Sequence, residues 1–284
     1  MIEGSCFCGT VRYEASGPFD SMMSCHCSMC RKHHGSAFAT YVTAPIDHFH
    51  WVRGEDALLE YKSSATGTRN SCGVCGSAVP MTMPSYSLAL LPAGPLEGDL
   101  GIKPQAHIFV GSRAPWYTIT DDLPQHEEYP PEMGAAGLER PKIEPRPGST
   151  AGSCLCGAVA YEATGEPMFM QSCHCQRCRR SRGAAHGTNI FYRAPQFSWT
   201  RGQELIAEYK LPEARFYAVA FCRQCGGALP KVSSERGVAV IPAGSLDTDP
   251  PMRAQRHIFT NYKAPWFEIT DALPQFAEGP PAVA

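Results

Sequence analysis

Fourteen cysteines carry the chemistry of this sequence, in two sets of seven, and each set is grouped as a pair, a triplet and a second pair. The first set contains Cys6 and Cys8, then Cys25, Cys27 and Cys30, then Cys72 and Cys75. The second set contains Cys154 and Cys156, then Cys173, Cys175 and Cys178, then Cys222 and Cys225. Because seven is odd, a disulfide framework would leave one thiol over in each set. Closely spaced thiols instead suit Zn²⁺, so the pattern predicts metal sites.

The seven thiols of one set can be divided between metals in two ways. Cys27 and Cys30 could join Cys72 and Cys75 in a four-thiolate ribbon, but the two pairs lie 42 positions apart. That exceeds the ~15 to 20 residues usual for such a ribbon. Alternatively, the two pairs close one four-cysteine site and the triplet binds a second metal alone. We favour this second division, because a CxCxxC stretch can chelate one ion and would leave it an open coordination position, as catalytic zinc sites do.

Both sets of cysteines belong to a tandem duplication. The segment "GSCFCGTVRYEASG" at 4–17 returns as "GSCLCGAVAYEATG" at 152–165, and "HIFVGSRAPWYTITDDLPQ" at 107–125 returns as "HIFTNYKAPWFEITDALPQ" at 257–275. These repeated segments occur in the same order in both copies. The length of the repeat is typical of a whole domain rather than of a solenoid unit. We therefore expect two domains, residues 1–132 and 149–284, joined by a Pro- and Gly-rich linker at 133–148.

The two copies differ in two loops. After the triplet, the first copy has "RKHHGSAF" and the second has "RRSRGAAH". Further along, "AGPLEGDLG" at 93–101 corresponds to "AGSLDTDPP" at 243–251. We interpret these differences as drift in tolerant loops. The alternative hypothesis is that each copy has lost part of its site and one functional pocket forms between them.

Short strands dominate the expected secondary structure. Val11, Tyr13 and Ala15 alternate with polar residues, which is typical of a strand with one buried face. Segments 214–221 and 237–244 are predicted strands, and a short helix is expected after each triplet. The predicted fold class is mainly β, with two tandem domains of short antiparallel strands.

Composition and charge narrow the class of protein. A chain of 284 residues with 43% hydrophobic content can bury substantial cores. A formal net charge of −2 argues against nucleic acid as a partner, and no stretch approaches the ~18 apolar residues of a membrane span. Cysteines at positions 6 and 8 leave no room for a secretory signal, so we expect a cytoplasmic, thiol-reducing compartment.

The order GSCxCGxVxYE, CHCxxCR, CxxCG and HIF…APW…LPQ resembles the family of glutathione-dependent formaldehyde-activating enzymes, which also resembles centromere protein V. The resemblance implies that each copy folds as a zinc-containing β-tent. It assigns the two pairs of each set to a structural zinc, and the triplet to a catalytic zinc, giving up to four zinc ions per chain. The implied partners are a small-molecule thiol, glutathione, and an aldehyde.

By this resemblance the chain is a carbon–sulfur lyase that condenses glutathione with formaldehyde to S-(hydroxymethyl)glutathione. The alternative is a non-catalytic zinc scaffold, or a module that binds glutathione or a protein. Basic residues directly follow the triplets and are candidate contacts for a glutathione carboxylate: Arg31, Lys32, Arg179 and Arg180. We expect His26 and His174, which lie between predicted ligands, to point away from the metal, and His107 and His257 to be core histidines.

Overall fold

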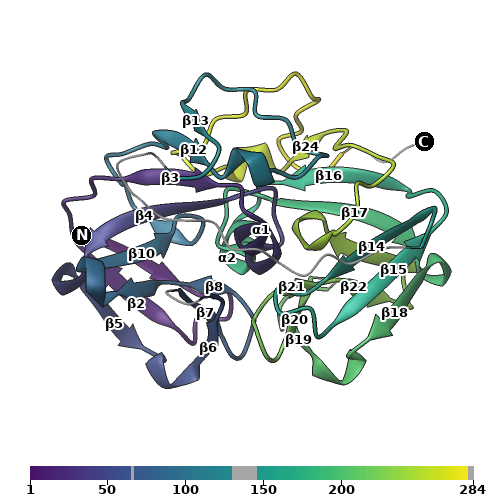
Figure 1. Ribbon diagram of the computed structural model, residues 1–284, viewed down its shortest axis with the longest axis horizontal. Coiled ribbons are helices and arrows are strands. Elements are labelled where there is room, and N and C mark those ends of the chain that lie inside the picture. The colour runs from purple at the N-terminus through teal and green to yellow at the C-terminus, as the bar shows by residue number, and fades with distance from the viewer. Residues whose placement is uncertain (65–66, 130–145, 216, 281–284) are drawn as a thin grey trace.

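The computed structural model describes residues 1–64, 67–129, 146–215 and 217–280. The two copies form two similar halves that lie side by side, with the helices α1 (Ser28–His34) and α2 (Gln176–Arg182) together at the centre (Figure 1). Most of the predicted linker, residues 133–145, lies outside the described residues, so the domain limits stay a prediction.

The described strands of the first half form three sheets. The four-stranded sheet has the order β11 (Leu96–Glu97), β1 (Ile2–Ser5), β2 (Arg12–Ala15) and β5 (Phe49–Arg53). The six-stranded sheet has the order β13 (Gln125–His126), β12 (Ala106–Ile108), β3 (Met22–Cys25), β4 (Ala39–Pro45), β10 (Leu88–Pro92) and β9 (Met81–Met83). The third sheet contains β6 (Leu58–Lys62), β7 (Thr68–Cys72) and β8 (Ala78–Val79).

The second half repeats this plan with fewer edge strands. Its first sheet contains β14 (Ser149–Ser153), β15 (Ala160–Thr164) and β18 (Phe197–Arg201). The second has the order β22 (Lys231–Ser233), β23 (Val238–Pro242), β17 (Gly187–Arg193), β16 (Phe169–Cys173) and β24 (His257–Ile258). The third contains β19 (Ile206–Lys210), β20 (Ala218–Cys222) and β21 (Ala228–Leu229).

The prediction of a mainly β fold with short antiparallel strands is confirmed. Three details differ from the sequence-based expectation. The short helix expected after each triplet begins inside it, so that Cys30 and Cys178 are helical. The strand expected at 214–221 begins only at Ala218, because the Ala214 N–H donates to the Leu211 carbonyl and closes a turn. In addition, β12 pairs with β3 in parallel, and β24 pairs likewise with β16, which brings the HIF segments beside the triplets.

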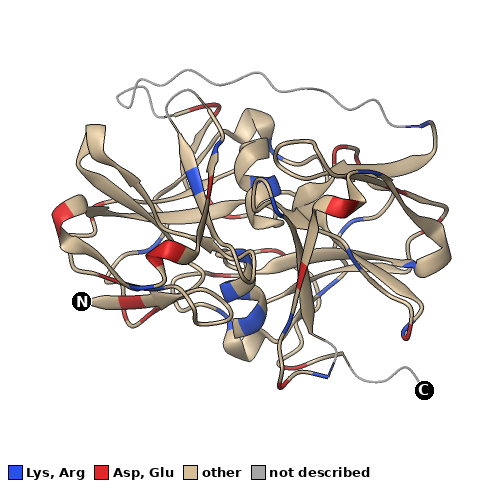
Figure 2. Ribbon diagram, turned by 90° about the horizontal axis from the view of Figure 1, so that it is seen from below, with Lys and Arg blue, Asp and Glu red and all other residues tan. Residues whose placement is uncertain are grey.

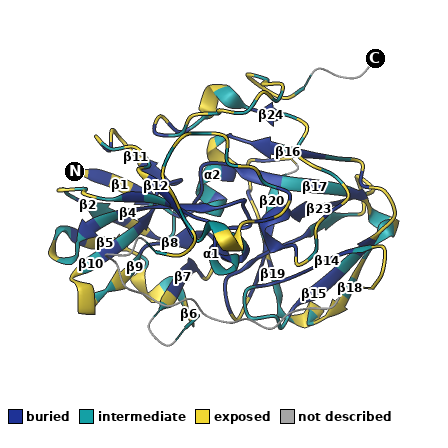
Figure 3. Cartoon of the chain, turned by 45° about the horizontal axis from the view of Figure 1, so that its top comes forward, coloured by how far each residue is buried: buried dark blue, intermediate teal, exposed yellow. Residues whose placement is uncertain are grey.

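One hydrophobic core runs through both halves. The predicted alternation of buried and exposed residues is confirmed, because Val11, Tyr13 and Ala15 are buried and Arg12 is exposed. Tyr13 belongs to the same buried cluster as its counterpart Tyr161 of the second copy. Figure 3 shows buried residues along the strands that meet at the centre. Because burying apolar area is the main stabilising term in folding, this shared core fixes the two halves against each other.

Among the described residues, charged side chains of both signs are spread over the ribbon, and lysine and arginine are concentrated on α1 and α2 (Figure 2). Neither of the two α-helices in the described ranges has the length and apolar character needed to cross a membrane.

Equivalent ion pairs of the two copies cross the interface between the halves. Lys32 on α1 forms an ion pair of 2.6 Å with Asp247, and its Nζ also donates to the carbonyl and hydroxyl oxygens of Ser153 at 2.9 and 2.7 Å. Arg180, the counterpart of Lys32, pairs with Glu97, the counterpart of Asp247. The side chains of the first pair are 10% and 14% exposed, and those of the second are 26% and 53% exposed. The differing loops at 93–101 and 243–251 therefore lie where the two halves meet.

Lys32→Ala is expected to lower the free energy of unfolding by about 3–5 kcal/mol, because it leaves the carboxylate of Asp247 buried without its ion-pair partner. The matched variant is Arg180→Ala, which removes the more exposed pair and should cost about 0–1 kcal/mol. Urea unfolding of the full chain measures both losses. Equal losses of unfolding free energy in the two variants would show that the difference in burial does not determine how much each ion pair contributes to stability.

Candidate metal centres and active sites

Each copy contains one four-cysteine cluster and one separate three-cysteine cluster. Within each cluster, the Sγ atoms all lie within 4.8 Å of one another. The four-cysteine clusters combine the terminal pairs: Cys6, Cys8, Cys72 and Cys75 in the first copy, and Cys154, Cys156, Cys222 and Cys225 in the second. The three-cysteine clusters are the triplets Cys25, Cys27 and Cys30, and Cys173, Cys175 and Cys178. This grouping corresponds to the second of the two divisions considered from the spacing.

Two tight turns build the four-cysteine cluster of the first copy. In the β1–β2 turn, the Cys6 N–H donates to the Val11 carbonyl at 3.0 Å, and the Val11 N–H donates to Cys6 Sγ at 3.2 Å. In the β7–β8 turn, Gly76 has a φ of 70° and donates its N–H to the Cys72 carbonyl at 2.8 Å. Glycine suits this left-handed position because it lacks a Cβ. These two turns bring four thiols together in the protein interior. Four thiol ligands fit a structural Zn²⁺ site, which has no open coordination position.

The triplet of the first copy is built where a strand passes into a helix. Cys25 ends β3, Cys27 caps the N-terminus of α1, and Cys30 lies in its first turn. The Cys30 N–H donates to Cys27 Sγ at 3.3 Å. Hydrogen bonds from the Cys25 and Cys30 thiols lower the pKa of Cys27 well below its ordinary value. The donor set therefore suits a thiophilic ion such as Zn²⁺, with three protein ligands rather than four.

The second triplet has the same construction. Cys175 caps α2, and the Cys178 N–H donates to Cys175 Sγ at 3.4 Å. Hydrogen bonds from Cys173 and then Cys178 lower the pKa of Cys175 to about 3. In both copies the thiol at the helix N-terminus also accepts a backbone N–H, which favours its ionised form.

A buried guanidinium from β7 lies against the first triplet. Arg69 is 8% exposed, and it donates to Cys30 Sγ at 3.6 Å and to the Tyr41 hydroxyl at 3.4 Å. The Tyr41 hydroxyl also lies 2.7 Å from Nε2 of His34, whose pKa burial lowers to about 3, so that the ring is neutral. Arg69 offsets part of the negative charge of three thiolates. No sequence motif pointed to Arg69, because it lies outside every cysteine motif.

The second triplet has different neighbours. The counterpart of Arg69 is Val219, and the Tyr217 hydroxyl instead donates to Cys178 Sγ at 3.7 Å. Arg182 occupies the helix position that His34 has in the first copy. Burial lowers the pKa of Arg182, and the nearby Tyr217 and Cys178 act in the opposite direction. Both triplets therefore have a cationic neighbour, supplied by a strand in one copy and by a helix in the other.

The four basic residues that follow the triplets are already engaged within the protein. Lys32 and Arg180 form the ion pairs between the halves. Arg31 and Arg179 donate to backbone carbonyl oxygens of neighbouring segments. Contacts between these residues and glutathione remain a prediction, and the engaged positions of Lys32 and Arg180 make Arg31 and Arg179 the better candidates.

A hydrogen-bonded chain of Asp121, His107 and His26 leads to the first triplet. Nε2 of His107 lies 3.0 Å from the Asp121 carboxylate, and its Nδ1 lies 2.8 Å from Nε2 of His26. Because a carboxylate only accepts, a neutral His107 carries its proton on Nε2 and accepts at Nδ1 from His26. His26 is fully buried, and among the described residues its Nδ1 has no partner. The second copy repeats this chain in Asp271, His257 and His174.

His26 and His174 join neither kind of thiol cluster in the described chain. Their predicted orientation away from the metal agrees with this grouping. His107 and His257 are buried, as expected, but they also connect a carboxylate near the surface to the loop that carries two thiols of each triplet.

His186→Phe is expected to make the chain less sensitive to acid. Burial lowers the pKa of His186 to about 3, whereas an unfolded histidine has a pKa near 6.5. Below pH ~6.5 the unfolded state therefore binds a proton that the folded state excludes, so stability falls as the pH falls toward 3. Between pH 7 and 4.5, the wild type should lose about 2–3 kcal/mol more than the variant. Urea unfolding at both pH values measures the difference.

The matched control is the reverse change, Phe38→His, since Phe38 is the counterpart of His186 and is equally buried. It should add acid sensitivity of similar size. An unchanged difference between wild type and His186→Phe across the two pH values would contradict the prediction.

The fold and the thiol clusters define a mainly β protein of two similar halves, each with one cluster of four thiols and one cluster of three. The model of the family "Glutathione-dependent formaldehyde-activating enzyme" matches residues 1–112 and 149–262, and the chain belongs to this family.

Two known proteins are similar to parts of this chain. A Halomonas elongata protein that carries the provisional name glutathione-dependent formaldehyde-activating enzyme is 28% identical over 128 residues, which cover 42% of this chain and 81% of that protein. A crystal structure of a Rhodobacter sphaeroides protein aligns with a TM-score of 0.30 at 27% identity, over 34% of this chain and 89% of that chain.

Proposed function

We propose that this chain is a carbon–sulfur lyase that condenses glutathione with formaldehyde, or with a related small electrophile, at the two triplets. The observation that carries the proposal is the separation of each triplet from the four-cysteine cluster. Membership of the family supports the general reaction. The four-cysteine clusters would hold structural zinc, and the triplets would hold the zinc at which the substrate thiol is deprotonated.

The rate increase that zinc binding would give depends on how far the glutathione thiol ionises. A thiol with a pKa near 8.5 is only ~3% thiolate at pH 7. Complete ionisation raises the nucleophile concentration about 30-fold, which corresponds to about 2 kcal/mol. In the addition itself, the glutathione sulfur forms a bond to the carbonyl carbon, the C=O π bond breaks, and the proton lost by the thiol ends on the oxygen. Positioning of the two reactants must supply the rest of the acceleration.

Residues of this chain would support that addition by electrostatics. In the first copy, the Arg69 guanidinium beside Cys30 lowers the cost of collecting negative charge at the triplet. In the second copy, the Tyr217 hydroxyl is hydrogen bonded to Cys178, and Ser181 lies 2.8 Å from the same hydroxyl. Apolar side chains, among them Met23 and Phe109, pack around the first triplet and keep bulk water from it.

The test is glutathione-dependent formaldehyde consumption by the full chain, with zinc counted on the same sample. We expect four zinc ions per chain and turnover above the uncatalysed rate, and S-methylglutathione, whose sulfur is blocked, should give none. A zinc-loaded chain that does not exceed the uncatalysed rate would contradict the enzymatic proposal.

Burial of the first triplet favours a second candidate, a non-catalytic zinc scaffold or binding module. Cys25, Cys27 and Cys30 are each no more than 9% exposed, which restricts the approach of a tripeptide. Glutathione that binds saturably without turnover would support this function instead.

A further inference from the structure

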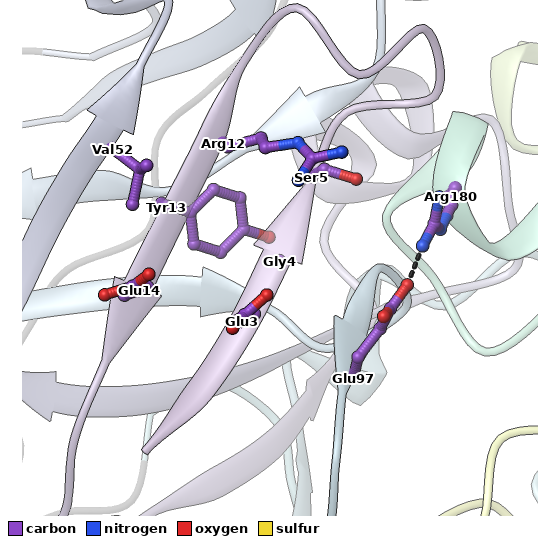
Figure 4. A pocket seen from close by; sticks show the side chains of 9 residues that line it. All are labelled: Glu3, Gly4, Ser5, Arg12, Tyr13, Glu14, Val52, Glu97 and Arg180. Carbon is purple, nitrogen blue, oxygen red and sulfur yellow. Dashed lines mark ion pairs between the residues drawn. The ribbon is translucent and has the colours of Figure 1, made fainter.

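A cavity of about 130 Å³ lies between the first half and helix α2 of the second half. Its walls come from β1 and β2, which carry Ser5 and Tyr13, from Glu97 of β11, and from Arg180 of α2 (Figure 4). The four-cysteine and three-cysteine clusters do not include any of these residues. The lining is therefore distinct from the proposed metal ligands, although Ser5 directly precedes one of them, Cys6.

The cavity of the first copy can be compared with the equivalent position in the second copy, where a lysine side chain occupies this space. There the ammonium of Lys32 enters from α1 and binds the carboxylate of Asp247 at 2.6 Å. It also donates to the carbonyl and hydroxyl oxygens of Ser153 at 2.9 and 2.7 Å, and the Ser245 carbonyl lies at 3.5 Å. The second copy thus shows that this arrangement of serine, carboxylate and carbonyl groups binds a primary ammonium.

The first copy keeps the serine and the carboxylate, but it lacks the ammonium. Ser5 corresponds to Ser153, Glu97 corresponds to Asp247, and Arg180 stands where the second copy receives Lys32. Arg180 pairs with Glu97, and within the described ranges its side chain makes no hydrogen bond to Ser5. A planar guanidinium is a poor substitute for a compact ammonium at such a site.

A second observation points to a missing partner in the same cavity. Tyr13 is 1% exposed and lines the cavity, and its hydroxyl has no hydrogen-bond partner among the described residues. In the second copy, the equivalent Tyr161 hydroxyl lies 2.6 Å from the hydroxyl of Ser245, whose counterpart in the first copy is Pro95. Figure 4 shows the Tyr13 ring pointing toward Gly4, on the strand that carries Ser5.

The charges around the cavity favour a cation. Three carboxylates line it, those of Glu3, Glu14 and Glu97, against the two guanidinium groups of Arg12 and Arg180. The second copy has alanines, Ala151 and Ala160, in place of Glu3 and Arg12. The lining has one more carboxylate than guanidinium groups, and the equivalent residues Glu162, Asp247 and Lys32 of the second copy have one more carboxylate than ammonium groups.

We propose that this cavity is a binding site for a primary organic ammonium group, which takes the place that the Lys32 ammonium has in the second copy. The ligand nitrogen would donate to the Ser5 hydroxyl and to Glu97. The source of the ammonium is a small amine that enters between the two halves.

Methylammonium is the probe, and binding is followed from the backbone amide shifts of Ser5 and Glu97 in the ¹⁵N-labelled full chain. We expect saturable binding with a dissociation constant on the order of 10 mM, as suits a ligand of two heavy atoms. Tetramethylammonium at equal ionic strength should not bind, because it has no N–H donor. Arg180→Lys should weaken methylammonium binding at least tenfold, since the lysine would supply the ammonium itself.

Lys32→Ala provides the matched positive control, because it empties the equivalent place in the second copy. In that variant methylammonium should raise the urea midpoint of unfolding, and sodium chloride at equal ionic strength should not. Three results would overturn the proposal: no saturable shifts in the wild type, equal binding of tetramethylammonium, or undiminished binding in a folded Arg180→Lys chain.

Discussion

Replacing Cys25 and Cys173 together with serine is expected to abolish glutathione-dependent turnover, with a loss of at least ~100-fold, on the order of 3 kcal/mol in transition-state stabilisation. Each triplet then retains two thiols, too few to hold a metal that needs three. Zinc should fall from four ions per chain to three in each single variant and to two in the double variant. Metal content and formaldehyde consumption are measured on the same preparations.

The matched controls change the residue directly after each capping cysteine. Ser28→Ala and Gln176→Ala alter the first helical residue of α1 and α2 without removing a thiol. Both should keep four zinc ions and wild-type turnover. If the two triplets work independently, each single cysteine variant should keep the activity of the other copy. Turnover that survives in the double variant would locate the reaction elsewhere in the chain.

Cys75→Ser, at the four-cysteine cluster, is expected to have the largest effect on stability. Cys6 and Cys72 are fully buried and Cys75 is 1% exposed, and Phe7 and Val11 pack around them. Binding free energy at structural zinc sites is also folding free energy, about 10–16 kcal/mol in zinc-finger peptides. Loss of one of four thiolates should therefore cost at least ~5 kcal/mol, the upper end of the loss expected for Lys32→Ala, and the first half should unfold first.

Thermal unfolding measures this effect in two independent ways. Cys75→Ser should lower the midpoint more than Cys25→Ser does, because the triplet contributes fewer ligands and lies outside the turns that join the strands. In the wild type, a chelator should lower the midpoint, and added Zn²⁺ but not Mg²⁺ should restore it, since thiolates prefer the softer ion. A midpoint insensitive to chelation would show that the cluster is stable without metal.

Local features of this protein could be read directly from the sequence. The two-residue alternation around Tyr13 depends only on strand geometry, so it predicted the buried face of β2. The duplication predicted two similar halves, and the short helices followed from the segments after the triplets. The spacing of the cysteines favoured the grouping of thiols that the structure has, because close ligands chelate one ion most easily.

The surroundings of the thiols depend on contacts between distant segments. Arg69 reaches Cys30 from 39 positions away, and the second copy has a valine at the equivalent position, so no motif contains this interaction. The parallel pairing of β12 with β3, which places His107 beside His26, follows from long-range sheet order rather than from local periodicity.

The roles of the basic residues after the triplets depend on the folded chain. As a sequence, Lys32 and Arg180 stand at equivalent positions with the same charge. In the folded chain, Lys32 is buried against Asp247 and Ser153, whereas Arg180 reaches Glu97 at the edge of a cavity. The two thiol sets and the strands that carry them could be predicted from the sequence, because they depend on neighbours along the chain. The packing of one copy on the other determined which charges are buried, because burial depends on the partner surface.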